Sequence, residues 1–259
     1  MDPRLREIEY PDSDGEPISD TDANIQRMFD AQTALKEAMR RRGVKAYVCG
    51  GVFVYPIEGD PTVRNSPDIL VAPECEPWPP RASFRYWEEP GRVQFAGEFL
   101  WVTERQTLED QWDCIEFYRG RLGTEELFLY EPLGEGMYDG FRFRFLRLDR
   151  GGVDQVIEPD GDGWFRSRGL GLDLRPTAER IEFRDSSTGE KYLPDRLRAE
   201  QAAARADRTA HEVTRAEVHA ARADHEAARA DREVAESVRL ERRVAQLEAE
   251  LRRLRGREE

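Results

Sequence analysis

The chain has 259 residues but few of the side chains that enzymes most often use for proton transfer. Its only histidines, His211, His219 and His225, lie near the C-terminus. Lysine occurs only as Lys36, Lys45 and Lys191, so the sequence has none between positions 46 and 190. The first 195 residues therefore offer no imidazole for acid–base catalysis, for a Ser-His or Cys-His pair, or for a histidine-containing zinc site.

Cysteine and long apolar runs are also scarce. Cys49, Cys75 and Cys114 are odd in number and widely spaced, so neither a disulfide framework nor a structural zinc site is indicated and we expect buried thiols. The sequence has no G-x-x-x-x-G-K-[ST] loop and no Gly-rich fingerprint between a strand and a helix, which argues against nucleotide hydrolysis and dinucleotide redox chemistry. The charged first residues and the lack of a long apolar segment predict a cytoplasmic protein with no signal peptide and no membrane contact.

The composition changes sharply after Pro194. Residues 196–255 contain no Pro or Gly and are rich in Ala, Arg and acidic residues, which predicts a domain over 1–195 and a helical coiled-coil tail over 196–259. The whole chain carries −13, and the tail has 15 Arg against 14 Asp and Glu, so the domain carries −14. Because proteins that bind duplex DNA usually present a basic face, this acidity disfavours DNA as a partner, although it does not exclude a local basic groove.

Apolar side chains in the tail follow heptad spacing. A weak, Ala-rich register runs from Ala202 to Val234, and a stronger one follows out of phase with it. The stronger register consists of Leu240, Val244, Leu247, Leu251 and Leu254. A single helix cannot bury these side chains, so we expect a homo-oligomer or a partner helix through residues 240–254; the alternative is a helix that packs on its own domain.

Periodicity in the first 195 residues predicts an α+β domain. A capped helix is expected from Asp20–Asp22 to Arg42, and a second helix over about 106–121. Strands are expected within 45–57, 68–73, 95–103, 127–132, 141–148, 163–167, 170–174 and 180–185, the last four as hairpins. In FRFRF (141–145), alternation sends the three Phe to one face and the two Arg to the other, solvated face.

The order of four short motifs resembles a known family. These motifs are SPDILVAP (66–73), T-x-E-x-Q-T-L-E-D ending at Asp110, D-x-x-x-C-x-x-x-Y ending at Tyr118, and LGTEELFLYEP (122–132). Together they are similar to the Uma-type (Uma-two) restriction endonuclease family of the PD-(D/E)XK nuclease superfamily, over nearly all of 1–195. The resemblance implies a restriction-endonuclease-like core with added β-hairpins, followed here by the coiled-coil tail.

The resemblance also implies a site. In that family two carboxylates from adjacent strands hold Mg²⁺ or Mn²⁺ at the scissile phosphate, and a nearby lysine orients the attacking water. Asp68 matches the first carboxylate, and Asp110 matches a retained acidic position on the helix. Counting back ten residues from Asp110 gives Leu100 where a metal-binding Glu is expected, and counting on four gives Cys114 where the lysine is expected.

Two hypotheses follow from these substitutions, and a third, DNA binding without cleavage, needs a basic face and is disfavoured by the charge of −14 on the domain. The first is a catalytically impaired nuclease-like protein that acts through self-association or partner binding. The second is an active divalent-metal endonuclease in which Asp68 works with Glu98 or Asp110; Glu98 shares a strand face with Leu100, and Glu104 is a further neighbour. Arg119 offers a nearby positive charge, but a guanidinium cannot titrate as a lysine does.

Overall fold

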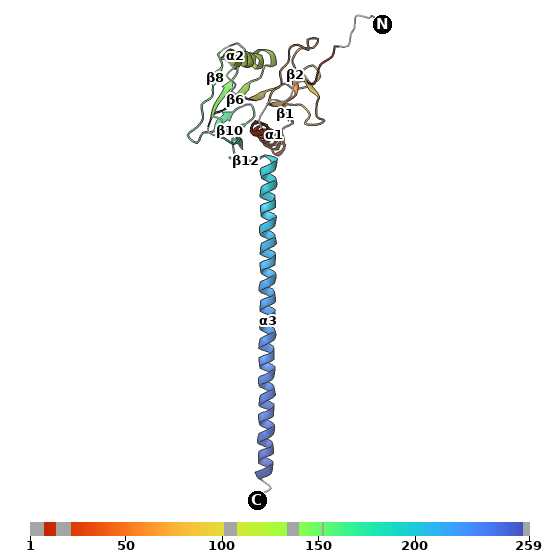
Figure 1. Cartoon of the computed structure of the whole chain (residues 1–259), viewed down its shortest axis with the longest axis vertical. Coiled ribbons are helices and arrows are strands. Elements are labelled where there is room, and N and C mark those ends of the chain that lie inside the picture. The colour runs from red at the N-terminus through yellow and green to blue at the C-terminus, as the bar shows by residue number, and fades with distance from the viewer. Residues whose placement is uncertain (1–7, 14–21, 101–107, 134–139, 152, 256–259) are drawn as a thin grey trace, which may run out of the picture. The chain divides into compact units, whose positions relative to one another are not determined.

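The computed structural model describes the whole chain except residues 1–7, 14–21, 101–107, 134–139, 152 and 256–259 (Figure 1). The chain divides into two compact units, Met1–Arg198 and Ala199–Glu259, and each is described by itself. The mixture of helices and sheets in the first unit confirms the predicted α+β class. No helix in the described part of the chain combines the length and the apolar character that a membrane crossing requires.

A six-stranded sheet forms the centre of the first unit, in the order β1-β3-β5-β6-β7-β8. Its strands are β1 (Ala46–Cys49), β3 (Ile69–Pro73), β5 (Phe95–Phe99), β6 (Glu126–Leu133), β7 (Gly140–Arg147) and β8 (Gln155–Val156). Neighbouring strands are antiparallel except β5 and β6, which are parallel. The crossover between those two strands contains α2 (Leu108–Glu116) and a π-helical turn, η1 (Phe117–Leu122).

Two smaller sheets complete the unit. An antiparallel sheet has the order β12-β11-β10-β9, and a parallel pair joins β2 to β4. Their bounds are β2 Phe53–Tyr55, β4 Ser83–Arg85, β9 Phe165–Ser167, β10 Leu172–Pro176, β11 Ile181–Asp185 and β12 Lys191–Tyr192. The antiparallel sheet contains the expected hairpins of 163–167, 170–174 and 180–185, whereas the strand expected over 141–148 is β7 and pairs with β6 and β8 in the larger sheet.

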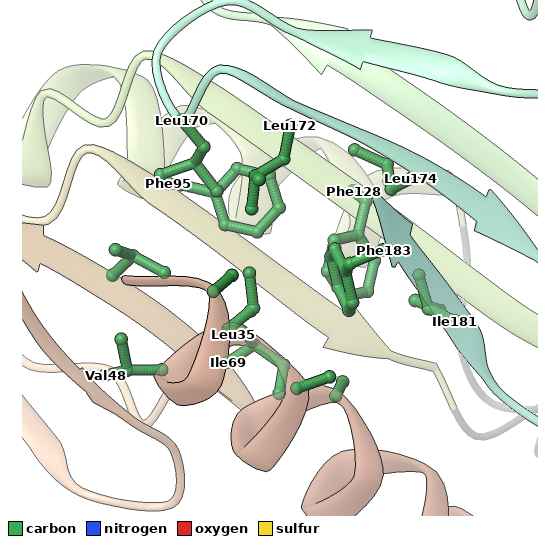
Figure 2. Close-up of a cluster of buried hydrophobic side chains, with 14 of the residues drawn as sticks. Leu35, Val48, Ile69, Phe95, Phe128, Leu170, Leu172, Leu174, Ile181 and Phe183 are labelled. Carbon is green, nitrogen blue, oxygen red and sulfur yellow. The ribbon is translucent and has the colours of Figure 1, made fainter. Parts of the chain in front are cut away.

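The six-stranded sheet is covered on both faces. On one face, α1 (Asp22–Arg41) and strands β9 to β12 enclose an apolar core that includes Leu35, Ile69 and Phe128 (Figure 2). On the other face, Ile115, Tyr118 and other residues of α2 and η1 pack with Leu70, Ala96 and Leu129 of the sheet. Residues that alternate along β3, β5 and β6 therefore point into two separate cores, as the period of two along a strand requires.

Three local features differ from the sequence prediction. The expected strand over 45–57 is broken at Gly50 and Gly51: a side chain at Gly50 would collide with the Asp68 carbonyl oxygen, and Gly51 has φ of +71°. The helix expected over 106–121 changes to π geometry from Phe117. Strands β4, β8 and β12 have only two or three residues and give too little periodicity to be recognised.

Helix α3 (Asp195–Arg255) is continuous and confirms the long C-terminal helix. Its first turn belongs to the first unit, which ends at Arg198, and this turn forms ion pairs with α1. The Arg196 guanidinium lies 2.8 Å from the Asp30 carboxylate, and that of Arg198 lies 2.5 Å from the Glu37 carboxylate. Hydrogen bonds from Arg40 and Arg198 lower the pKa of Glu37 to about 2. From Ala199 to Ala249 every residue of α3 is exposed.

A substitution at Gly97 would test how closely side chains pack on this face of the sheet. The Phe128 ring lies over the Gly97 Cα, and any Cβ at this position would collide with the ring. We expect Gly97→Ala to lower the free energy of unfolding by about 1–3 kcal/mol, as overpacking of a core usually does. Urea denaturation measures the change. Gly161→Ala is the matched control, because open space surrounds Gly161, and an equal effect of the two substitutions would contradict the close packing.

Candidate functional site: a carboxylate pair between two strands

Asp68 and Glu98 lie opposite each other on the six-stranded sheet. Strand β3 pairs with β5 so that Ile69 faces Gly97 and Leu70 faces Ala96. Asp68 comes directly before β3, and the same antiparallel register places it opposite Glu98. Directly opposed residues have Cβ atoms about 4.5–5.5 Å apart, so the two carboxyl groups meet on the sheet face that carries α2 and η1.

Backbone and side-chain hydrogen bonds fix this pair. The backbone N–H of Phe99 donates to the Asp68 carboxylate at 2.7 Å. The Tyr118 hydroxyl donates to the Glu98 carboxylate, and the Asn65 amide donates to the Tyr118 oxygen at 3.3 Å. Tyr118 is fully buried, so its ring encloses one side of the pair and its hydroxyl holds Glu98 in place.

Burial and mutual repulsion change how these groups titrate. Desolvation, followed by the negative charge of Asp68, raises the pKa of Glu98 well above its ordinary value. Desolvation and the charge of Glu98 likewise raise the pKa of Tyr118. Two carboxylates this close cannot both be ionised without a large repulsion, so the pair favours a state with one shared proton.

Cys114 of α2 has a thiol whose pKa is raised by desolvation and by the charges of both carboxylates. It is half-buried, and desolvation together with the charges of Glu98 and Asp68 raises its pKa far above that of a free thiol. The positive charge of Arg144 opposes this rise. The thiol is therefore protonated at neutral pH, and it neither acts as a nucleophile nor supplies a positive charge to the pair.

Leu100 does not occupy the position opposite Asp68. Its backbone N–H donates to the Tyr130 carbonyl at 2.7 Å, and its half-buried side chain packs with the apolar core beneath α2. The carboxylate that the sheet register brings to Asp68 is Glu98, two residues earlier on the same face. Glu98 is the alternative to Leu100 that the sequence suggests, and the register places it opposite Asp68.

The other residues expected near the site are placed as follows. Asp110 belongs to helix α2, but the structure describes only its backbone and not its side chain. Glu104 lies outside the described residues. Arg119 pairs instead with Glu116 and with Asp154, the latter at 2.9 Å. Lys45 pairs with Glu76 and Lys191 with Glu182, away from the carboxylate pair.

Arg144 lies on the arginine face that the sequence predicts for its strand, but the sequence pattern does not connect it with the carboxylate pair. Glu98 of β5 faces Leu129 of β6, which in turn faces Arg144 of β7, so these residues lie in one row across the sheet. The alternation in FRFRF correctly separates Arg142 and Arg144 from the phenylalanines, since both arginines are exposed. What it could not indicate is that the arginine face of β7 continues the face that carries Asp68 and Glu98.

The donor set suits a hard divalent cation only in part. Two carboxylates can hold Mg²⁺ or Mn²⁺ if water fills the remaining positions. Within the described residues, however, no group of three or more His, Cys, Asp and Glu side chains is arranged to bind a metal. Comparison of the chain with family models, curated proteins and solved structures gave no match.

The raised pKa of Glu98 predicts how stability depends on pH. Glutamate titrates near 4.5 in the unfolded chain, and folding favours protonated Glu98, so wild-type stability should fall as the pH rises from 4.5 through the higher folded pKa. Glu98→Gln removes this loss while keeping an acceptor for Tyr118. As the pH rises above 4.5, the free energy of unfolding of Glu98→Gln should therefore increase relative to that of the wild type. The increase should be about 1.4 kcal/mol for each tenfold difference in the proton affinity of Glu98 between the folded and unfolded chain.

Urea denaturation from pH 4 to pH 9 measures the difference between the two proteins. Glu58→Gln, at an exposed loop position, is the control and should show no such trend. A constant difference between Glu98→Gln and the wild type across this range would show that Glu98 titrates normally.

Proposed function

We propose that residues 1–195 form a restriction-endonuclease-like domain of the PD-(D/E)XK type whose phosphodiester hydrolysis is impaired, and that the protein acts through association of its tail. The resemblance to the Uma-type family implies two acidic side chains from adjacent strands, and Asp68 and Glu98 are such a pair. On this proposal Asp68 and Glu98 stand for the acidic pair of the family, although Leu100 stands where sequence counting expects its second member.

The observation that carries the proposal is the chemistry beside the pair. The position four residues after Asp110 holds Cys114, a neutral thiol under the influence of both carboxylates. A lysine there would orient water and balance the negative charge that develops in the transition state. Tyr118, which donates to Glu98, stabilises the pair as it stands but does not replace that positive charge.

The second candidate is an active divalent-metal endonuclease that uses Asp68 with Glu98 or Asp110. The close approach of Asp68 and Glu98 favours it, because the two carboxylates would hold Mg²⁺ or Mn²⁺, which stabilises negative charge on a phosphate. Arg144 lies in the same row of the sheet and would supply positive charge without titrating. The net charge of −14 on residues 1–195 counts against this candidate, since it opposes DNA binding.

Association through α3 is the other half of the proposal. Leu240, Val244 and Leu247 are 61%, 54% and 44% exposed, although leucine and valine are usually buried. Their spacing of four and three residues makes one apolar stripe on the helix. Covering such a stripe with a second helix is favourable because it removes apolar surface from water, so the stripe supports association of the tail.

Restoring the missing lysine tests the impaired site. We expect no cleavage of plasmid or single-stranded DNA by the wild type in Mg²⁺ or Mn²⁺, and we expect Cys114→Lys to raise metal-dependent cleavage by about 100-fold over background, a typical effect of one acid–base group. Gel electrophoresis of the products measures cleavage. Cys114→Arg is the matched control, because it adds charge without a titrating group, and Asp68→Ala should abolish the gain.

The same assay distinguishes the two candidates. Cleavage by the wild type that is lost in both Asp68→Ala and Glu98→Gln would establish the active endonuclease and contradict the first proposal. Failure of Cys114→Lys to cleave, with its fold intact by circular dichroism, would show that the missing lysine does not explain the impairment.

Light scattering on the full chain tests the association. We expect a concentration-dependent oligomer, and we expect Leu247→Glu to convert it to monomer because each buried charge within an apolar seam costs several kcal/mol. Removal of residues 236–259 should have the same effect. Ala249→Glu is the matched control, since Ala249 is exposed on the opposite side of the heptad and should not matter. A monomeric wild type would overturn this part of the proposal.

A further inference from the structure

The residue types in the exposed stripe on α3 indicate which kind of helix would pair with it. Described residues 199–249 of the helix are all exposed, and Leu240, Val244 and Leu247 form its densest apolar set. In heptad notation Leu240 and Leu247 occupy d positions and Val244 occupies an a position. The sequence continues the pattern with Leu at 251 (a) and 254 (d). Among parallel coiled coils, a β-branched residue at a with leucine at d favours two strands, and Val244 supplies one of the two a positions.

Charges beside the stripe favour pairing with an identical helix. In a parallel, in-register pair, each g position approaches the e position five residues later on the other copy. Arg243 (g) then approaches Glu248 (e), and position 250, Glu, is matched with position 255, Arg. In this parallel pair the one g–e match that brings like charges together is Glu236 (g) with Glu241 (e).

An antiparallel pair of the same segments is electrostatically poorer. Antiparallel helices bring g positions near g positions and e positions near e positions. Arg243 would still approach an opposite charge, at position 250, but Glu241 would approach Glu248. Attraction and repulsion then offset each other, whereas in the parallel arrangement attractions outnumber repulsions.

The Ala-rich part of the helix does not extend the same pairing. In its register the g and e positions of a parallel pair match Glu212 with Glu217 and Glu226 with Asp231, so like charges repel. The two registers also change phase between Val234 and Leu240. Both features confine a parallel pairing to the last part of α3.

We propose that residues 240–254 of α3 form a parallel, in-register, two-stranded coiled coil with a second copy of this chain. This inference rests on the self-association proposed above and names its partner, orientation and extent. Because the paired segment spans only two heptads, the dimer is weak and forms as the protein concentration rises.

Disulfide trapping of the full chain tests the orientation. In a parallel, in-register pair the two copies of position 244 face each other at a separation that suits a disulfide. We expect Val244→Cys to give a covalent dimer under mild oxidation. Arg242→Cys, at the outward f position, should not, and the unchanged chain reports any background from Cys49, Cys75 and Cys114.

Charge exchange tests the identity of the partner. We expect Arg243→Glu to weaken dimerisation by about tenfold at low salt, and the double variant Arg243→Glu, Glu248→Arg to restore it. Arg242→Glu makes the same charge change at an f position and should have little effect. Sedimentation equilibrium measures each dissociation constant.

The outcomes separate this inference from the one it rests on. A dimer by light scattering without a Val244→Cys disulfide would overturn the parallel register while leaving self-association intact. Disulfide formation in a mixture of Leu240→Cys and Leu251→Cys chains, but not in Val244→Cys, would establish the antiparallel pair. A trimer or tetramer would overturn the two-stranded arrangement, and a monomer at all concentrations would overturn self-association itself.

Discussion

The antiparallel pairing of β3 with β5 is the interaction on which the rest of the first unit depends. It places strand β5 in the middle of the larger sheet, with β3 on one side and the parallel strand β6 on the other. One face of this strand carries Phe95 and Phe99 into the core beneath α1, and the other carries Ala96 and Glu98 toward α2. A shift of one residue in the pairing would exchange these faces and bury a carboxylate among aromatic rings.

The carboxylate pair accounts for the hydrogen-bond donors that surround it. Two acidic groups side by side in a partly desolvated place destabilise a fold unless protons or donors offset their charge. Here the Phe99 N–H donates to Asp68 and the Tyr118 hydroxyl donates to Glu98. The π-helical turn that contains Tyr118 belongs to the same arrangement, since local π geometry is frequent where a helix must aim one side chain at a site.

Much of the fold could be predicted from local pattern. Helix α1, the long helix α3 and the alternation in β7 follow from periodicity and caps that lie within a few residues of one another. The site was harder to predict because it depends on strand register, which joins residues 30 or more positions apart. Asp68 and Tyr118 lie in motifs that resemble those of the Uma-type family, and Glu98 is the alternative to Leu100. Which residues face each other across β3, β5, β6 and β7 is set by the register, and this brings Glu98 opposite Asp68 and Arg144 into the same row.

The ion pairs at the start of α3 determine where the folded unit ends. Asp30 and Glu37 retain only 3% and 8% of their side-chain exposure, and Arg196 and Arg198 neutralise them. A chain that stopped at Pro194, where the composition changes, would leave Asp30 without Arg196 and would leave Glu37 with Arg40 but without Arg198. Removing a partner from a nearly buried carboxylate is destabilising. The first turn of the tail therefore contributes to the stability of the domain. A change of composition along a sequence does not always mark the boundary of a cooperative folding unit.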